Sequence, residues 1–196
     1  IAIPGVIDGM RYTRQGQACT AGSRVYIHEK IYDKVLDGVV DKLSKLKMGN
    51  ALDNTSDIGA IISEEQLERT LYYMDIAKKN SSTKILHGGN QSKGGEYKDG
   101  FYYEPTLLSG LPVSSPVCQE EVFGPVACAI PFKSFDEVMK SANDTQFGLS
   151  AVLWTKDLSR ALQFVDEIEA GFVQVNQCVA PRANVSYGGI KMSGLG

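Results

Sequence analysis

The sequence has few of the features that mark membrane, secreted or metal-binding proteins. It contains no apolar run near the roughly 18 to 20 residues that a membrane span needs, and no charged start followed by an apolar segment. Four cysteines without a Cys-x-x-Cys pair, and only two histidines, argue against a disulfide framework or a metal site. We expect a metal-free, cytoplasmic protein, although a targeting signal upstream of Ile1 stays open because the chain does not begin with Met.

An excess of basic residues is also missing. Twenty Lys and Arg stand against 23 Asp and Glu, a formal net charge of −3, so nucleic acid and anionic membranes are poor partners for this chain. The 196 residues include 43% hydrophobic and 22% charged side chains, which is typical of a globular domain with a sizeable core. We therefore expect one globular domain over residues 1–196.

Apolar periodicity predicts strands that alternate with helices. The expected strands cover residues 25–28, 83–86, 101–108, 126–132, 150–155 and 172–176. Helices are expected over residues 31–46 and 158–170, and after Ser63 and Ser134, where Gln66 and Glu137 complete capping boxes. Near-continuous apolar strands such as 151–154 favour a parallel sheet covered on both faces. The predicted class is α/β, a three-layer αβα fold with a mostly parallel sheet and a Gly-rich loop over residues 88–100.

One cysteine has an unusual context. Glycine and small side chains surround Cys19 in the segment Gln15–Arg24, so backbone can approach whatever the sulfur contacts. If a helix opened after Gly16, its unpaired N–H groups would favour the thiolate and stabilise an oxyanion. A lone cysteine among small residues is also typical of a buried packing residue, and the residues alone favour that interpretation.

Two further segments carry residue types that bind ligands. In Gln119–Val126 a carboxylate could accept hydrogen bonds from sugar hydroxyls while Phe123 packs a flat ring, although an acidic pair beside a turn is usually solvated. The glycine-dense end Tyr187–Gly196 holds neither a Rossmann fingerprint nor a P-loop and by itself indicates a structural loop. His28 and His87 have no partner at an informative spacing, so we assign them no role.

Taken together and in this order, the segments resemble the aldehyde dehydrogenase superfamily. The resemblance rests on the motifs Gly16-Gln-Ala-Cys19, Glu120-Glu-Val-Phe-Gly-Pro-Val126, Asn143-Asp-Thr-Gln-Phe-Gly-Leu149 and Tyr187-Gly-Gly-Ile-Lys-Met-Ser-Gly194. It covers about residues 15–196, and several separated motifs in the family's order argue against coincidence. The resemblance implies the nucleophile-bearing catalytic domain of such an enzyme.

By this resemblance Cys19 is the nucleophile. Its thiolate would attack an aldehyde, the thiohemiacetal would pass a hydride to NAD or NADP, and water would hydrolyse the thioester to the carboxylic acid. The Cys19 N–H would supply half of the oxyanion hole. Glu121 matches the residue that contacts the nicotinamide ribose, and Phe123 matches the aromatic residue near that ring. Glu120 and Lys191 receive no role.

The resemblance says less about the substrate. The segment Gln177–Val185 falls where the family shapes its substrate entrance, which makes Cys178 a candidate lining residue. Arg182 would hold a carboxylate-bearing semialdehyde if it faced the tunnel, but a surface arginine is the simpler explanation. Cys118 and Cys128 are most simply packing residues. The resemblance implies a homodimeric or homotetrameric parent whose partner subunit pairs with the strand near residues 172–176.

Other parts of the family's machinery have no counterpart in this sequence. The family's cofactor-binding domain, its general-base glutamate, the asparagine of its oxyanion hole and its oligomerisation hairpin match nothing here, and Asp8 is the only carboxylate before Cys19. We expect this chain to be inactive alone. Two alternatives stay open: a CoA-acylating semialdehyde dehydrogenase, against which the Glu-Glu-Val-Phe-Gly-Pro form argues mildly, and a non-catalytic family member.

Overall fold

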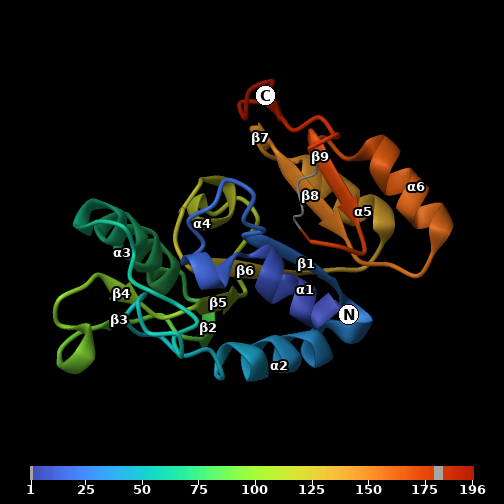
Figure 1. Ribbon diagram of the computed structural model, residues 1–196. Helices are drawn as coiled ribbons and strands as arrows, with labels where there is room; N and C mark the ends of the chain where they lie inside the picture. Colours follow the sequence, from blue (N-terminus) through green and yellow to red (C-terminus); the bar gives the residue numbers. More distant parts are fainter. Residues whose placement is uncertain (1, 179–182) are drawn as a thin grey trace.

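A four-stranded sheet forms the centre of the molecule (Figure 1). The computed structural model describes residues 2–178 and 183–196. The sheet has the order β1-β6-β5-β2, in which β1 pairs with β6 and β6 with β5 in parallel, whereas β2 runs antiparallel to β5. These strands are β1 (Arg24–His28), β2 (Lys84–His87), β5 (Thr106–Ser109) and β6 (Val126–Phe132). The predicted mostly parallel sheet is confirmed.

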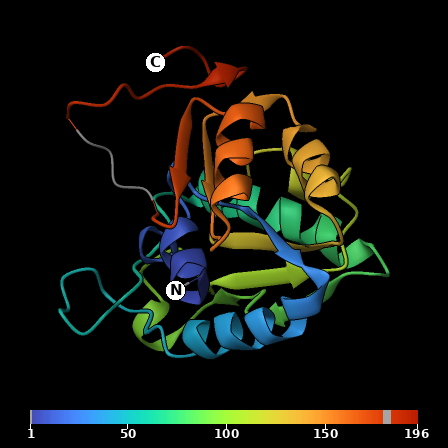
Figure 2. The ribbon, with the colours of Figure 1, turned by 90° about the vertical axis from the view of Figure 1, so that its right-hand side faces the viewer.

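Helices cover both faces of this sheet, as the three-layer prediction requires. Alternate residues of β6 point into different cores: Val126, Cys128 and Ile130 pack with α3 (Glu64–Lys79) and α4 (Pro116–Gln119). Ala127 and Ala129 pack with α1 (Ala2–Gly9) and α2 (Tyr32–Leu43) on the opposite face. Figure 2 shows α2 running along one side of the sheet with α3 beyond the other. The two-residue period of a strand thus divides one chain segment between two cores.

A second parallel pair lies beside the first sheet. Strands β8 (Ser150–Leu153) and β9 (Phe172–Val175) pair in parallel and are joined by α6 (Leu158–Glu167), which confirms the expected βαβ unit. The helix α5 (Phe135–Asn143) lies near α6 in both ribbon views (Figures 1 and 2). In α1, Gly5 leaves no room for a side chain, because a Cβ there would lie 2.1 Å from the Trp154 ring. This close approach joins α1 to the end of β8.

Some predicted boundaries were wrong. The predicted loop 88–100 contains β3 (Gln91–Ser92), which pairs with β4 (Tyr102–Tyr103), and the 3-10 turn Gly95–Tyr97. The break expected at Pro105 in the strand 101–108 is confirmed, because Pro105 has no N–H to donate and separates β4 from β5 (Thr106–Ser109). Helix α6 ends at Glu167, not at residue 170, and the stretch before α2 is a 3-10 turn. The helix α1 was missed because Pro4, Gly5 and Gly9 are poor helix formers that tertiary packing overrides.

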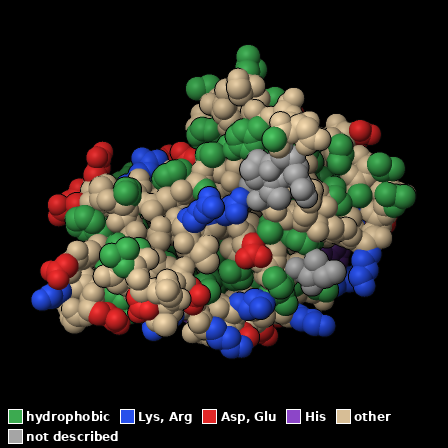
Figure 3. Space-filling model, viewed as in Figure 1, with side chains coloured by type: hydrophobic (Ala, Val, Ile, Leu, Met, Phe, Trp, Pro, Cys, Tyr) green, Lys and Arg blue, Asp and Glu red, His purple; other side chains and the backbone are tan. Residues whose placement is uncertain are grey.

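The predicted helix starts show the serine hydrogen bond of a capping box without its return bond, because Gln66 Nε2 donates to the 120–124 loop and Glu137 Oε2 accepts from the Lys133 N–H. Ser63 Oγ accepts from the Gln66 N–H at 3.2 Å, and Ser134 Oγ accepts from the Glu137 N–H at 3.2 Å. Each such cap contributes about 1 kcal/mol to stability. Among residues 2–178 and 183–196, no helix combines the length and apolar character needed to cross a membrane. Figure 3 shows acidic and basic side chains spread over the visible face without a patch of one sign.

Two glycines bring the Cys19 segment against the segment that follows α4. Gly16 has a positive φ of 65°, and a Cβ at this position would lie 2.1 Å from the carbonyl oxygen of Gly124. A Cβ on Gly124 would in turn lie 2.5 Å from Thr70 Oγ1 on α3. Earlier in the same segment, the hydroxyl of the buried Tyr12 donates to the Thr106 carbonyl of β5 at 2.8 Å. The Cys19 segment is therefore fixed to the centre of the sheet and to the 120–124 loop.

We predict that Gly16→Ala is much more destabilising than a glycine substitution with the same backbone strain but no contact. Gly94 also has a positive φ, 78°, but nothing lies within 4 Å of its Cβ position. We expect Gly94→Ala to lower the free energy of unfolding by about 1 kcal/mol, the cost of a left-handed backbone. Gly16→Ala should cost about 3 kcal/mol, because the overlap with Gly124 adds to that strain. Urea unfolding of both variants measures the difference, and equal losses would contradict the backbone contact.

Candidate active site

Cys19 lies in an exposed turn between the 3-10 turn Tyr12–Arg14 and β1. No helix opens after Gly16, so the conditional expectation of a helix N-terminus at this cysteine is wrong. Residues in the left-handed backbone conformation precede the cysteine instead, with φ of 59° at Arg11 and 55° at Gln15. Within the described part of the chain, the Cys19 N–H donates to no other residue. An unpaired N–H beside an exposed sulfur is the arrangement that an oxyanion contact requires.

The described neighbour of the sulfur is an aromatic hydroxyl from the other end of the chain. Tyr187 Oη lies 3.4 Å from Cys19 Sγ, and its ring meets Phe172 of β9 edge-on, with centroids 5.3 Å apart. The hydrogen bond with Cys19, together with burial and the charge of the sulfur, raises the pKa of Tyr187 to about 12. Tyr187 opens the motif Tyr187–Gly194, but the motif alone assigns it no role. Only the tertiary fold brings it to the cysteine.

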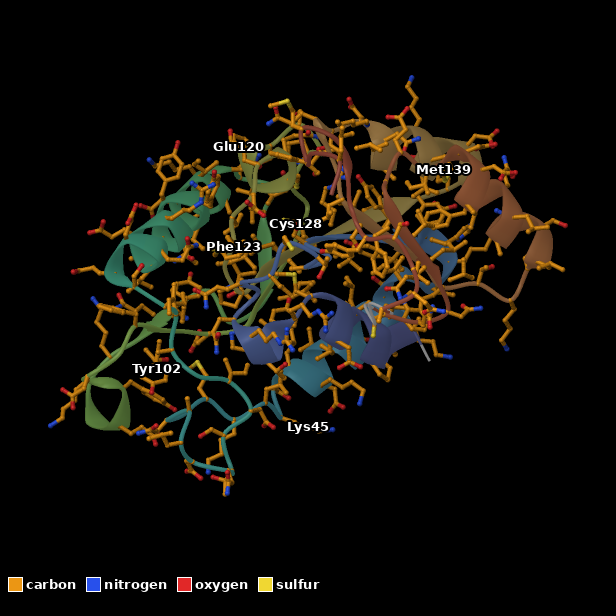
Figure 4. All side chains as sticks on the ribbon, turned by 45° about the horizontal axis from the view of Figure 1, so that its top comes forward. Lys45, Tyr102, Glu120, Phe123, Cys128 and Met139 are labelled. Carbon is orange, nitrogen blue, oxygen red and sulfur yellow. The ribbon has the colours of Figure 1, made fainter. Side chains whose placement is uncertain are left out.

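The loop that carries Glu121 and Phe123 is held through its backbone. Gln66 Nε2 donates to the carbonyls of Val122 at 3.0 Å and Phe123 at 2.8 Å. Arg69 donates to the Glu121 carbonyl through Nε at 3.1 Å and through Nη2. Both side chains come from the first two turns of α3, and Glu120 and Phe123 lie next to this helix in Figure 4. Four hydrogen bonds to carbonyl oxygens thus fix the backbone of the loop without using the side chains of Glu121 and Phe123.

The first acid of the pair is already engaged by the protein. The Tyr73 hydroxyl donates to Glu120 Oε2 at 2.7 Å, and Arg69 lies over the Tyr73 ring, 5.3 Å from its centroid. Burial and the hydrogen bond to Glu120 raise the pKa of Tyr73 to about 12, although Arg69 opposes this shift. Glu120 is thus a structural anchor between the loop and α3.

The second acid and the aromatic ring are presented differently. Glu121 is exposed, and its carboxylate has no hydrogen-bond or ion-pair partner among residues 2–178 and 183–196. Phe123 is half-buried and has a positive φ of 54°, a strained conformation for an aromatic residue. Such strain persists only where the surroundings impose it, and it is concentrated at binding and catalytic sites.

One cavity joins these residues. It has a volume of about 620 Å³ and is lined by Cys19, Glu121 and Phe123, and also by β1 and β8. The Glu121 carboxylate, which has no described partner, the Phe123 ring and the Cys19 thiol all line this cavity. The structure therefore brings Cys19, Glu121 and Phe123, which are far apart in the sequence, to the same cavity.

The other cysteines and Arg182 are placed differently, although Cys118 also lines the cavity. Cys118 and Cys128 are buried in one core, where their mutual hydrogen bond lowers the pKa of Cys118 and raises that of Cys128. Cys178 is half-buried near Gly9, and Arg182 falls outside the described residues. Within the described ranges, no group of three or more His, Cys, Asp or Glu side chains is arranged to hold a metal ion.

Sequence reasoning missed the residues that hold the site together. Gln66, Arg69, Thr70 and Tyr73 recur at the spacing of one helix face, and all four contact the 120–124 loop. This polar stripe beside an apolar one was a readable signal. Lys191 Nζ donates to the carbonyls of Asn143 and Thr145 and pairs with Glu169, which fastens the chain's last residues to the end of α5.

Comparison with known proteins places this geometry in a family. The model of the aldehyde dehydrogenase family matches residues 2–196. An aldehyde dehydrogenase from Rhodospirillum rubrum is 40% identical over 182 residues, 93% of this chain and 36% of that protein. A betaine aldehyde dehydrogenase from Mesorhizobium japonicum is 35% identical over 195 residues, all of this chain and 40% of that protein.

Solved structures agree in fold. The crystal structure of a betaine aldehyde dehydrogenase from Staphylococcus aureus in complex with NAD+ superposes with a TM-score of 0.94 at 33% identity, over 100% of this chain and 38% of that one. The chain thus spans a little over a third of the length of the relatives that it matches. It belongs to the aldehyde dehydrogenase family.

Proposed function

We propose that this chain is the nucleophile-bearing part of an NAD(P)-dependent aldehyde dehydrogenase that oxidises an aldehyde to a carboxylic acid. The observation that carries the proposal is one cavity lined by the exposed Cys19, by Glu121, whose carboxylate has no partner among the described residues, and by the strained Phe123. The names of the matched relatives support the reaction class. Structures of the Staphylococcus aureus relative include a BME-free and a BME-modified form of one cysteine, which supports a reactive thiol in this family.

Cys19 supplies the covalent chemistry in this proposal. Its thiolate forms a C–S bond to the aldehyde carbon, and the carbonyl π electrons move to the oxygen, which accepts a hydrogen bond from the Cys19 N–H. The nicotinamide, when bound, supplies the acceptor for the hydride that leaves this carbon. Water then adds to the thioester carbon, and the C–S bond breaks to release the acid and the thiolate.

Glu121 and Phe123 hold the cofactor in this proposal. The Glu121 carboxylate accepts hydrogen bonds from ribose hydroxyls, and the Phe123 ring packs against the nicotinamide side. The NAD+ complex of the Staphylococcus aureus relative supports NAD, while NADP stays within the proposal. The same proposal includes a cytoplasmic location and a homodimeric or homotetrameric parent. It also includes substrate contacts from Cys178 and Arg182, and inactivity of residues 1–196 alone.

We predict that Cys19→Ala abolishes aldehyde oxidation. In the protein at its natural length, NAD(P)H formation should fall at least about 10³-fold, because the covalent route is lost. The substrates to be assayed are aliphatic, aromatic and carboxylate-bearing aldehydes and also betaine aldehyde, which the name of a matched relative suggests. Cys128→Ala removes a buried thiol outside the cavity and should keep the activity.

Activity that survives Cys19→Ala would overturn the nucleophile assignment. Turnover that requires added CoA would instead support the CoA-acylating alternative. A wild-type protein that oxidises no aldehyde, with or without CoA, would favour the non-catalytic alternative.

We predict that Glu121→Gln weakens cofactor binding while its neighbour does not. The KM for NAD should rise about tenfold, the effect of weakening hydrogen bonds to a charged acceptor. Glu120→Gln is the matched control, because Tyr73 already occupies that carboxylate and the change should lower thermal stability but leave the KM for NAD unchanged. A larger KM effect from Glu120→Gln than from Glu121→Gln would reverse the assignment of the two acids.

A further inference from the structure

Among the described residues, the Tyr187 hydroxyl lies within hydrogen-bonding distance of the Cys19 sulfur. Its distance of 3.4 Å to Cys19 Sγ is within hydrogen-bonding range for sulfur, and the two residues are 168 positions apart. A thiolate has no proton to give, so in the ionised form of Cys19 the phenol is the donor. The raised pKa of Tyr187, about 12, means that the phenol keeps this proton at neutral pH.

The fold fixes the position of this hydroxyl from two sides. The Tyr187 ring packs on the buried Phe172 of β9. The next residue, Gly188, runs so close to Gly171 that a Cβ on Gly171 would lie 2.3 Å from the Gly188 carbonyl oxygen. The glycines after Tyr187 therefore allow backbone contact with the start of β9, and that contact aims the ring toward Cys19.

We propose that the Tyr187 hydroxyl donates a hydrogen bond to the Cys19 thiolate, which keeps the sulfur ionised and in one rotamer until an aldehyde arrives. This inference rests on the proposed function of Cys19. As the C–S bond forms, negative charge leaves the sulfur for the carbonyl oxygen, so the hydrogen bond weakens and the phenol proton stays on Tyr187. The contact favours the resting thiolate and is not a proton transfer.

Alkylation of the thiol tests this contact without any cofactor or aldehyde. Iodoacetamide reacts with the thiolate, the sulfur displaces iodide, and peptide mass spectrometry assigns the product to Cys19. In Tyr187→Phe we expect alkylation near pH 7 to be about fivefold slower, because one hydrogen bond to the charged form is lost. The same comparison is repeated at higher pH. The nearby charge of Arg11 is present in both.

Two variants separate the hydroxyl from other effects. Tyr32→Phe removes a hydroxyl that donates to the Ala129 carbonyl at 3.1 Å in the core, and it should leave Cys19 alkylation unchanged. Tyr187→Leu removes the ring as well. Once circular dichroism has shown that both variants are folded, Cys19 alkylation in Tyr187→Leu should be no slower than in Tyr187→Phe. Equal rates in wild type and Tyr187→Phe at all pH values, or slowing by Tyr187→Leu alone, would overturn the inference and leave the nucleophile intact.

Absence of Cys19 alkylation in the folded wild-type chain would overturn the proposed nucleophile together with this inference. The two failures are therefore distinguishable by the wild-type rate.

Discussion

The arrangement of the site depends on the backbone contact between Gly16 and Gly124. Gly16 precedes the cysteine segment, and Gly124 ends the loop with Glu121 and Phe123, so one van der Waals contact sets the spacing between the two halves of the site. Neither position has room for a Cβ, which explains the glycine in each motif more directly than turn formation does. The hydrogen bond from the Tyr12 hydroxyl to the Thr106 carbonyl also attaches the cysteine segment to the central sheet. Backbone contacts of this kind leave little freedom for relative movement.

Helix α3 holds the second half of the site by a different principle. Its polar face binds carbonyl oxygens of the 120–124 loop, and its apolar face packs in the core with Val126 and Cys128. The helix thus holds the backbone of the loop in the conformation that gives Phe123 its positive φ, and the Glu121 carboxylate has no described partner. The free energy that holds this strain comes from many ordinary contacts in the core. A ligand would therefore meet a loop whose backbone is already fixed, which lowers the ordering cost of binding.

Local sequence signals predicted the parts of the fold that local physics decides. The strand Val126–Phe132 was predicted with its observed bounds, because an uninterrupted apolar run between turns has few other solutions. The capping serines Ser63 and Ser134 were predicted for a similar reason, since the side chain and its N–H partner are three residues apart. In contrast, α1 contains proline and glycine, and its helical form depends on Trp154 and the second core. No window of sequence contains that information.

The residues of the candidate site also fall into those that the sequence predicts and those that depend on tertiary packing. Cys19, Glu121 and Phe123 could be singled out by residue type and by family resemblance, and the cavity does join them. Tyr187 could not, because its relation to Cys19 depends on how the chain's last residues pack on β9 and α5. Lys191 anchors that segment by neutralising Glu169 and satisfying two carbonyls, so a cation at one end of the motif helps to position a phenol at the other. The residues of the motif Tyr187–Gly194 therefore position one another. Its glycines permit close backbone approach, Lys191 fixes one end of the segment, and Tyr187 at the other end reaches the Cys19 sulfur.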